Sequence, residues 1–133
     1  MSYHISRTVT LPFDAAVAAT TAALQRHGFG VLTEIDVQAT LKKKLDAAFR
    51  PYRMVGACNP GFAYKALQAE DKIGTMLPCN VIVQQHDDGT VEVSAVDPIA
   101  SMQAIDNPQL APIAGEVRRL LHEVIEDMAT ARA

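Results

Sequence analysis

The segment from Val81 to Val96 constrains the fold most, because it has the pattern of a β-hairpin. Two runs rich in β-branched residues, 81–85 and 90–96, flank Asp87-Asp88-Gly89, and an Asp-Gly pair supplies the positive φ angles of a tight turn. In the second run, apolar residues alternate with polar ones. This alternation is typical of an antiparallel sheet with one buried face and one polar face.

The rest of the chain alternates between strand and helix patterns. We expect strands at residues 3–11, 30–37, 54–58, 79–85 and 90–96, and helices at residues 12–27, 39–49, 60–72 and from 107 onward. The element order is therefore β-α-β-α-β-α-β-β-α. Because several strands have one polar face, the helices should gather on the other. The sequence predicts an α+β two-layer sandwich, with a mixed, mainly antiparallel sheet of about five strands, in a single domain over residues 1–133.

The second strand, at residues 30–37, carries both apolar and acidic side chains. Strict alternation places Val31, Ile35 and Val37 toward the helices, and Leu32, Glu34 and Asp36 on the opposite face. Glu34 and Asp36 could then act as paired carboxylates in acid–base chemistry if they were buried, although exposed strand charges are far more common. Leu32, Ile82 and Val96 on the polar face suggest a dimer contact, or else singly exposed apolar residues.

Two helix boundaries rest on proline. Asn107-Pro108 should start the last helix, with an asparagine cap and proline in the first turn, and Pro51 should end the second helix. Tyr64 lies on the third helix, where it either lines a pocket or packs.

Charge and composition exclude several classes of function. Twelve basic and 15 acidic residues give a net charge of −3, so we expect no nucleic-acid partner. No apolar run approaches the roughly 20 residues that span a bilayer, and the first residues lack the apolar core of a signal peptide. We expect a cytoplasmic protein with no membrane partner, whose two cysteines are free thiols.

The two cysteines are the candidates for specific chemistry. Cys58 lies one residue ahead of a predicted helix start at Asn59-Pro60, where the helix dipole would stabilise a reactive thiolate. Cys79 follows Pro78 and begins a strand, on the same face as Val81 and Val83. Twenty intervening residues do not determine whether the two thiols meet. The alternative is that both are buried small side chains.

These motifs resemble those of the domain of unknown function 302 family. The resemblance lies in the strings GACNP at 56–60 and LPCNV at 77–81, in Asp97-Pro98, and in the stretches 30–37 and 49–52. It implies a small α+β domain, typically bacterial or archaeal, that often forms a homodimer. It implies no established activity, so no catalytic residue is assigned. The residues that match the motifs and suit a pocket are our ligand-site candidates: Gly56, Cys58, Asn59, Pro60, Pro78, Cys79, Asn80 and Asp97.

Three functions follow as hypotheses. The first is a dimeric ligand- or metal-binding module with a pocket at the turns Cys58-Asn59-Pro60 and Pro78-Cys79-Asn80, where Cys58 and Cys79 bind copper(I), zinc or haem iron. The second is an enzyme of sulfur transfer or thiol–disulfide exchange, with Cys58 as nucleophile and Cys79 as the resolving thiol. The third is a structural dimer with inert cysteines.

Overall fold

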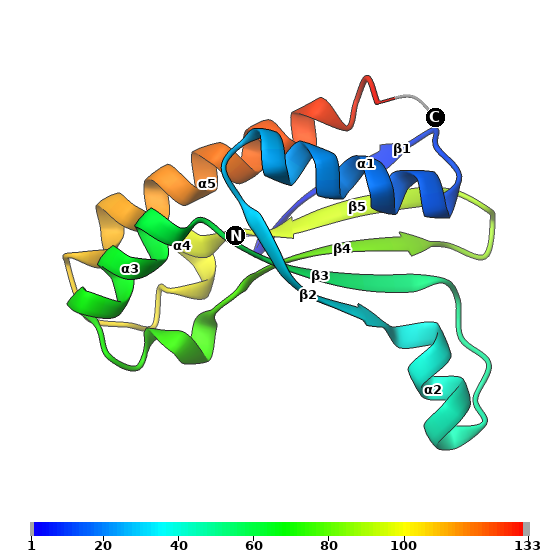
Figure 1. Ribbon diagram of the computed structural model, residues 1–133, viewed down its shortest axis with the longest axis horizontal. Helices are drawn as coiled ribbons and strands as arrows, with labels where there is room; N and C mark the ends of the chain where they lie inside the picture. The colour runs from blue at the N-terminus through cyan, green and yellow to red at the C-terminus, as the bar shows by residue number, and fades with distance from the viewer. Residues whose placement is uncertain (1, 132–133) are drawn as a thin grey trace.

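Five strands form one sheet in the order β1-β5-β4-β3-β2, and each of its four pairings is antiparallel (Figure 1). The structure is a computed structural model that describes residues 2–131. The elements are β1 His4–Val9, α1 Phe13–Arg26, β2 Gly30–Asp36, α2 Val37–Leu45, β3 Tyr52–Cys58, α3 Pro60–Ala69, the 3-10 turn η1 Ile73–Met76, β4 Cys79–Gln85, β5 Val91–Val96, α4 Pro98–Ser101 and α5 Leu110–Asp127. The predicted α+β class and element order are confirmed.

Helices α1 and α5 lie side by side on one face of the sheet (Figure 1). Helix α1 contacts β2 to β5, and α5 contacts β1 and β5. The core between the layers is built from small and β-branched strand residues and one stripe of each helix, including Leu24, Val55, Val81, Val93 and Leu121, all fully buried. The opposite face of the sheet stays open, while α2 projects from the far end of β2 and β3. Helices α1 and α5 thus cover one face, as the polar strand faces predicted, whereas α2 buries no residue.

The β4–β5 hairpin follows its predicted turn chemistry. Gly89 has a φ of +89°, and the Asp88 carboxylate accepts hydrogen bonds from the Thr90 amide and hydroxyl. Burial then alternates along β4, where Cys79, Val81 and Val83 face the helices. The predicted position of Cys79 at the start of this strand is confirmed.

Strand β2 departs from the predicted alternation because it contains a β-bulge. Val31 pairs with Ala57, but the next paired residue of β2 is Thr33, which lies opposite Gly56. The pairs that follow are Glu34 with Val55, Ile35 with Met54 and Asp36 with Arg53. One extra residue between Val31 and Thr33 turns every later side chain to the other face. Ile35, predicted to face the helices, is therefore on the open face and 47% exposed, whereas Glu34 and Asp36 lie on the helix face. Val37 is the first residue of α2 rather than part of the strand.

Three predicted helix boundaries were wrong. The Asp36 carboxylate caps α2 through the Ala39 amide, and α2 ends at Leu45, where Asp46 adopts a φ of +51°, well before Pro51. The α3 helix ends at Ala69, before the separate turn η1. Asn107 does not cap α5, which begins at Leu110.

Asn107 instead ties the end of α3 to the segment before α5. Its Nδ2 donates to the Ala69 carbonyl at 2.8 Å, and its Oδ1 accepts from the Gln109 amide at 3.0 Å. The residue is thus used as a link between two segments rather than as a helix cap. Among residues 2–131, no helix has the length and apolarity needed to cross a bilayer.

Candidate functional site

Both cysteines line one small cavity, at the edge where β3 ends and β4 begins. In the register of β3 with β4, Cys79 pairs with Ala57. Cys58 is the residue that directly follows Ala57 in the chain. The cavity has a volume of about 30 Å³. Its walls are apolar apart from the two thiols and Asn59, and they include Phe29, Phe62 and residues of α3 and α5. The fold therefore brings together two thiols that are 20 residues apart in the sequence.

The start of α3 fixes the backbone on the Cys58 side of the cavity. Asn59 is the N-cap, its Oδ1 accepting from the Phe62 amide at 3.3 Å, and Pro60 follows as the first helical residue. Gly28 (φ +86°), in the turn after α1, packs against this cap, and a Cβ there would lie 3.2 Å from Asn59 Nδ2. The predicted cap is confirmed, and Pro60 itself is exposed outside the cavity.

Burial makes both thiols weaker acids. Desolvation raises the pKa of Cys58 above its usual value. Cys79 is more deeply buried, and desolvation together with the nearby Cys58 raises the pKa of Cys79 to about 11. This loss of hydration disfavours the charged form of Cys58 and so opposes the helix-dipole argument for a reactive thiolate.

A third sulfur lines the same cavity. Met102, half-buried at the C-terminal cap of α4, contributes to the wall together with Ile113, Ala114 and Val117 of α5. Sequence reasoning missed Met102, because nothing in its local pattern distinguishes it from a core methionine. The only available signal was its place, four residues after the end of the Asp97-Pro98 motif.

Gly56, Pro78 and Asn80 lie beside the cavity without lining it. A Cβ on Gly56 would overlap Thr33 Oγ1, would lie 2.8 Å from Pro78 Cγ, and would be 3.6 Å from Asn80 Oδ1. The Leu77–Pro78 peptide bond is cis. These residues pack closely at the junction of β2, β3 and β4, so a glycine is required there for close approach. Asn80 is exposed on the open face.

Asp97 is a structural cap rather than a lining residue. Its side chain is largely buried, and its Oδ1 accepts from the Ile99 and Ala100 amides at the start of α4. Its Oδ2 accepts from Arg118 Nε on α5 at 2.9 Å. Asp97 thereby fixes α4, and with it Met102, against α5.

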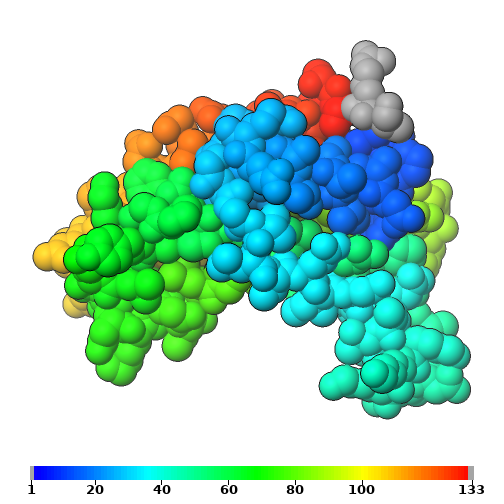
Figure 2. Space-filling model, in the orientation of Figure 1, coloured from blue at the N-terminus to red at the C-terminus, as the bar shows by residue number. Residues whose placement is uncertain are grey.

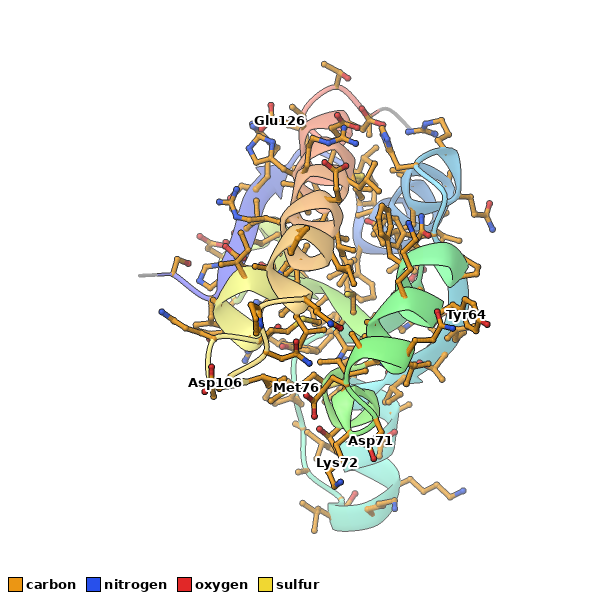
Figure 3. The ribbon with its side chains drawn as sticks, turned by 90° about the vertical axis from the view of Figure 1, so that its left-hand side faces the viewer. Tyr64, Asp71, Lys72, Met76, Asp106 and Glu126 are labelled. Carbon is orange, nitrogen blue, oxygen red and sulfur yellow. The ribbon has the colours of Figure 1, made fainter. Side chains whose placement is uncertain are left out.

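Other residues singled out in the sequence do not join the site. Glu34 and Asp36 both face Arg53, at 2.6 Å and 3.6 Å, so they are ion-paired rather than arranged for acid–base work. Tyr64 is exposed and points outward from α3, as Figure 3 shows. Within residues 2–131, no three side chains of His, Cys, Asp or Glu converge as metal ligands.

Comparison with known proteins agrees with this fold. The family model described as Domain of unknown function DUF302 matches residues 5–128. The chain belongs to the DUF302 family. A crystal structure of an uncharacterized conserved protein DUF302 from Bacillus stearothermophilus superposes with a TM-score of 0.90 at 25% identity, over 96% of this chain and 99% of that one. A search of curated proteins finds no match.

Membership in the DUF302 family accounts for the shared motifs in structural terms. The asparagine and aspartate of the Asn59-Pro60 and Asp97-Pro98 pairs are helix caps, and Gly56 permits close packing. Cys79 packs in the core between the sheet and the helices, whereas Cys58 is only partly buried. The two cysteines are the motif residues of this DUF302 chain that carry thiol side chains.

Proposed function

We propose that this protein is a dimeric module that binds one soft metal ion, copper(I), between Cys58 and Cys79. The observation that carries the proposal is that two cysteines distant in sequence line one small apolar cavity. Thiolates are soft ligands, and they favour copper(I) and zinc over harder ions. A site with two thiolates also suits the low coordination number that this ion accepts.

The size of the cavity restricts the ligand. About 30 Å³ accommodates a single ion, whereas pockets for drug-sized ligands and cofactors measure about 300–1,000 Å³. Haem therefore does not fit without wide opening of the helices. Structural zinc takes four protein ligands, and the described residues supply no third His, Cys, Asp or Glu. Of copper(I), zinc and haem iron, the three ligands predicted from the sequence, copper(I) is the one that this cavity favours.

Metal binding also gives the buried thiols a means to ionise. A metal ion replaces the thiol proton, so binding releases protons and strengthens as the pH rises. Cys58 directly precedes the N-cap of α3, and the partial positive charge of that helix end offsets the negative charge of a bis-thiolate complex.

The cavity favours metal binding over thiol catalysis. A nucleophilic cysteine needs a neighbouring base or a lowered pKa. The lining residues include no His, Lys, Arg, Asp or Glu, and burial raises the pKa of both thiols. A sulfur-transfer or redox enzyme would lack a group to take the thiol proton.

The open face of the sheet is the proposed dimer contact. Tyr52, Met54, Ile82 and Val96 lie on this face, and none is fully buried within one chain. In Figure 2 the same side is hollowed between the projecting α2 and the end of the molecule that carries α3 and η1. A second copy related by twofold symmetry would place its own apolar strand residues against these, as isologous interfaces do.

An anaerobic titration with copper(I) against a competing chelator tests the metal site. The wild type should bind one ion per chain, and both Cys58→Ser and Cys79→Ala should abolish tight binding while retaining the far-UV spectrum of the folded protein. Met76→Leu is the matched control, because Met76 is a half-exposed sulfur on η1 that does not line the cavity. Unchanged affinity in both cysteine variants would refute the proposal.

A further inference from the structure

A second cavity adjoins the thiol cavity. It measures about 280 Å³ and lies between α4, the segment 103–109 and the start of α5. Met102 and Ala114 line both cavities. Because alanine has no flexible side chain, Met102 is the movable part of the shared wall.

The backbone of Met102 is held in place by α4, and its side chain is only partly buried. Its amide donates to the Pro98 carbonyl at 3.0 Å within α4, and α4 is fixed by the Asp97 cap and the ion pair of Asp97 with Arg118. Methionine is unbranched, with three rotatable bonds and a polarisable sulfur. Because Met102 lines both the 280 Å³ cavity and the thiol cavity, rotation about its side-chain bonds would carry the thioether toward the thiols.

We infer that Met102 supplies a third, neutral sulfur ligand to the ion held by Cys58 and Cys79, and that the cavity between α4 and α5 is the route by which the ion reaches them. This inference rests on the proposed function. It makes the site a three-sulfur centre assembled from the end of β3, the start of β4 and the end of α4.

Charge explains why the third ligand is a thioether. Two thiolates and one copper(I) ion already carry a net charge of −1 in an apolar cavity. A third anionic ligand would add another buried charge, which is costly without a partner. A thioether adds a soft donor and no charge, and thioethers are ligands that favour copper(I) over harder ions.

Comparing Met102→Leu with Met76→Leu tests the inference. Both changes replace sulfur by carbon at similar volume, but only Met102 lines the thiol cavity. Changes outside the ligand shell commonly weaken metal binding 10- to 100-fold, so loss of a ligand should weaken copper(I) binding by at least about tenfold. Met76→Leu should match the wild type. The X-ray absorption edge of the copper(I) complex should change from a three-coordinate to a two-coordinate form only in Met102→Leu.

The outcomes separate the inference from the proposed function. If the wild type and Met102→Leu bind copper(I) equally, with the same absorption edge, Met102 is not a ligand and the two-cysteine site stands without it. If the wild type binds no copper(I), the proposed function fails and the inference fails with it. The entry route has its own readout: Ala111→Phe, which narrows the second cavity and does not line the thiol cavity, should slow copper(I) uptake. Unchanged uptake would overturn the route.

Discussion

Arg118 Nε donates to Asp97 Oδ2 at 2.9 Å and so joins the start of α4 to the middle of α5. The aspartate is largely buried, and its other oxygen caps α4. This pair sets the position of α4, whose C-terminal cap is Met102, in the wall of the thiol cavity. A surface arginine thus supports the geometry of a site it does not touch.

Replacing Arg118 should destabilise the fold more than replacing its neighbour. Arg118→Gln leaves the Asp97 carboxylate without its charged partner, which should cost about 1–3 kcal/mol in the free energy of unfolding. Arg119→Gln is the control. Among residues 2–131, Arg119 pairs only with Glu116 and Glu123 on the helix surface, and such pairs contribute about 0–1 kcal/mol. Urea denaturation measures both. Equal losses would show that the Asp97 pair does not fix α4.

Gly56 should tolerate no side chain. In Gly56→Ala the new methyl group would collide with Thr33 and Pro78, and overpacking of this kind costs about 1–3 kcal/mol. Gly115→Ala is the matched control, because a Cβ built there in α5 has no atom within 4 Å apart from its chain neighbours and the adjacent turns of helix backbone. Alanine in a helix interior should stabilise by about 0.5–1 kcal/mol relative to glycine. Thermal unfolding compares the two, and a stable Gly56→Ala would contradict the packing at this junction.

Asp127 should contribute stability that disappears in acid. The hydrogen bond from His27, and secondarily that from Arg26, lowers the pKa of the Asp127 carboxyl. A lowered pKa in the folded state gives stability that is present above the pKa of the unfolded state and is lost as the pH falls through the folded value. Asp127→Asn should therefore lose about 0.5–1 kcal/mol at neutral pH.

That deficit should shrink as the pH falls below about 4, the ordinary range of an aspartate. Asp106→Asn is the control, because Asp106 is exposed and makes no ion pair with any described residue. Unfolding free energies measured across the acid range report the difference. A deficit for Asp127→Asn that stays constant down to the lowest pH would contradict the ion-pair account.

Neither thiol should be unusually reactive in the metal-free protein. With the pKa of Cys79 at about 11, only about one thiol in a thousand is ionised at pH 8, and Cys58 should react faster because it is less buried. Alkylation resolved by mass spectrometry, from about pH 6 to 10, measures both rates. In urea, both rates should rise to that of a free cysteine. Labelling of native Cys58 faster than free cysteine at neutral pH would restore the enzyme hypothesis.

The open sheet face should control association. Ile82→Glu places a charge at the centre of this face and should convert a dimer into monomers, as measured by light scattering. Tyr64→Glu, which changes an exposed residue on the outer side of α3, should leave the assembly unchanged. Dissociation by Tyr64→Glu but not by Ile82→Glu would place the interface elsewhere.

Features that are determined by neighbouring residues in the chain could be predicted from the sequence. The Asp-Gly turn, the Asn59-Pro60 helix start and the inward position of Cys79 follow from neighbours in the chain. The bulge between Val31 and Thr33 does not, because strict alternation gives no sign of an extra residue. Asn107 was likewise misjudged, since its side-chain amide donates to the Ala69 carbonyl at the end of α3, a contact that its neighbours in the chain do not indicate.

The site was only partly predictable for a related reason. Sequence patterns can mark a cysteine beside a helix start, but the meeting of Cys58 with Cys79 depends on the β3–β4 register. Met102 joins them only through the packing of α4 on α5, a contact that the Asp97–Arg118 pair fixes. The partial burial of Cys58, which raises the pKa of its thiol, is not visible in a sequence, while a helix start is.

Protection of both thiols by a single metal ion is the most direct test of the proposed centre. One equivalent of copper(I) should block alkylation of Cys58 and Cys79 together, so that mass spectrometry finds chains with both cysteines free of label. If Cys58 is still labelled at its metal-free rate in the presence of saturating copper(I), the two cysteines do not share an ion, and the proposed metal site is wrong.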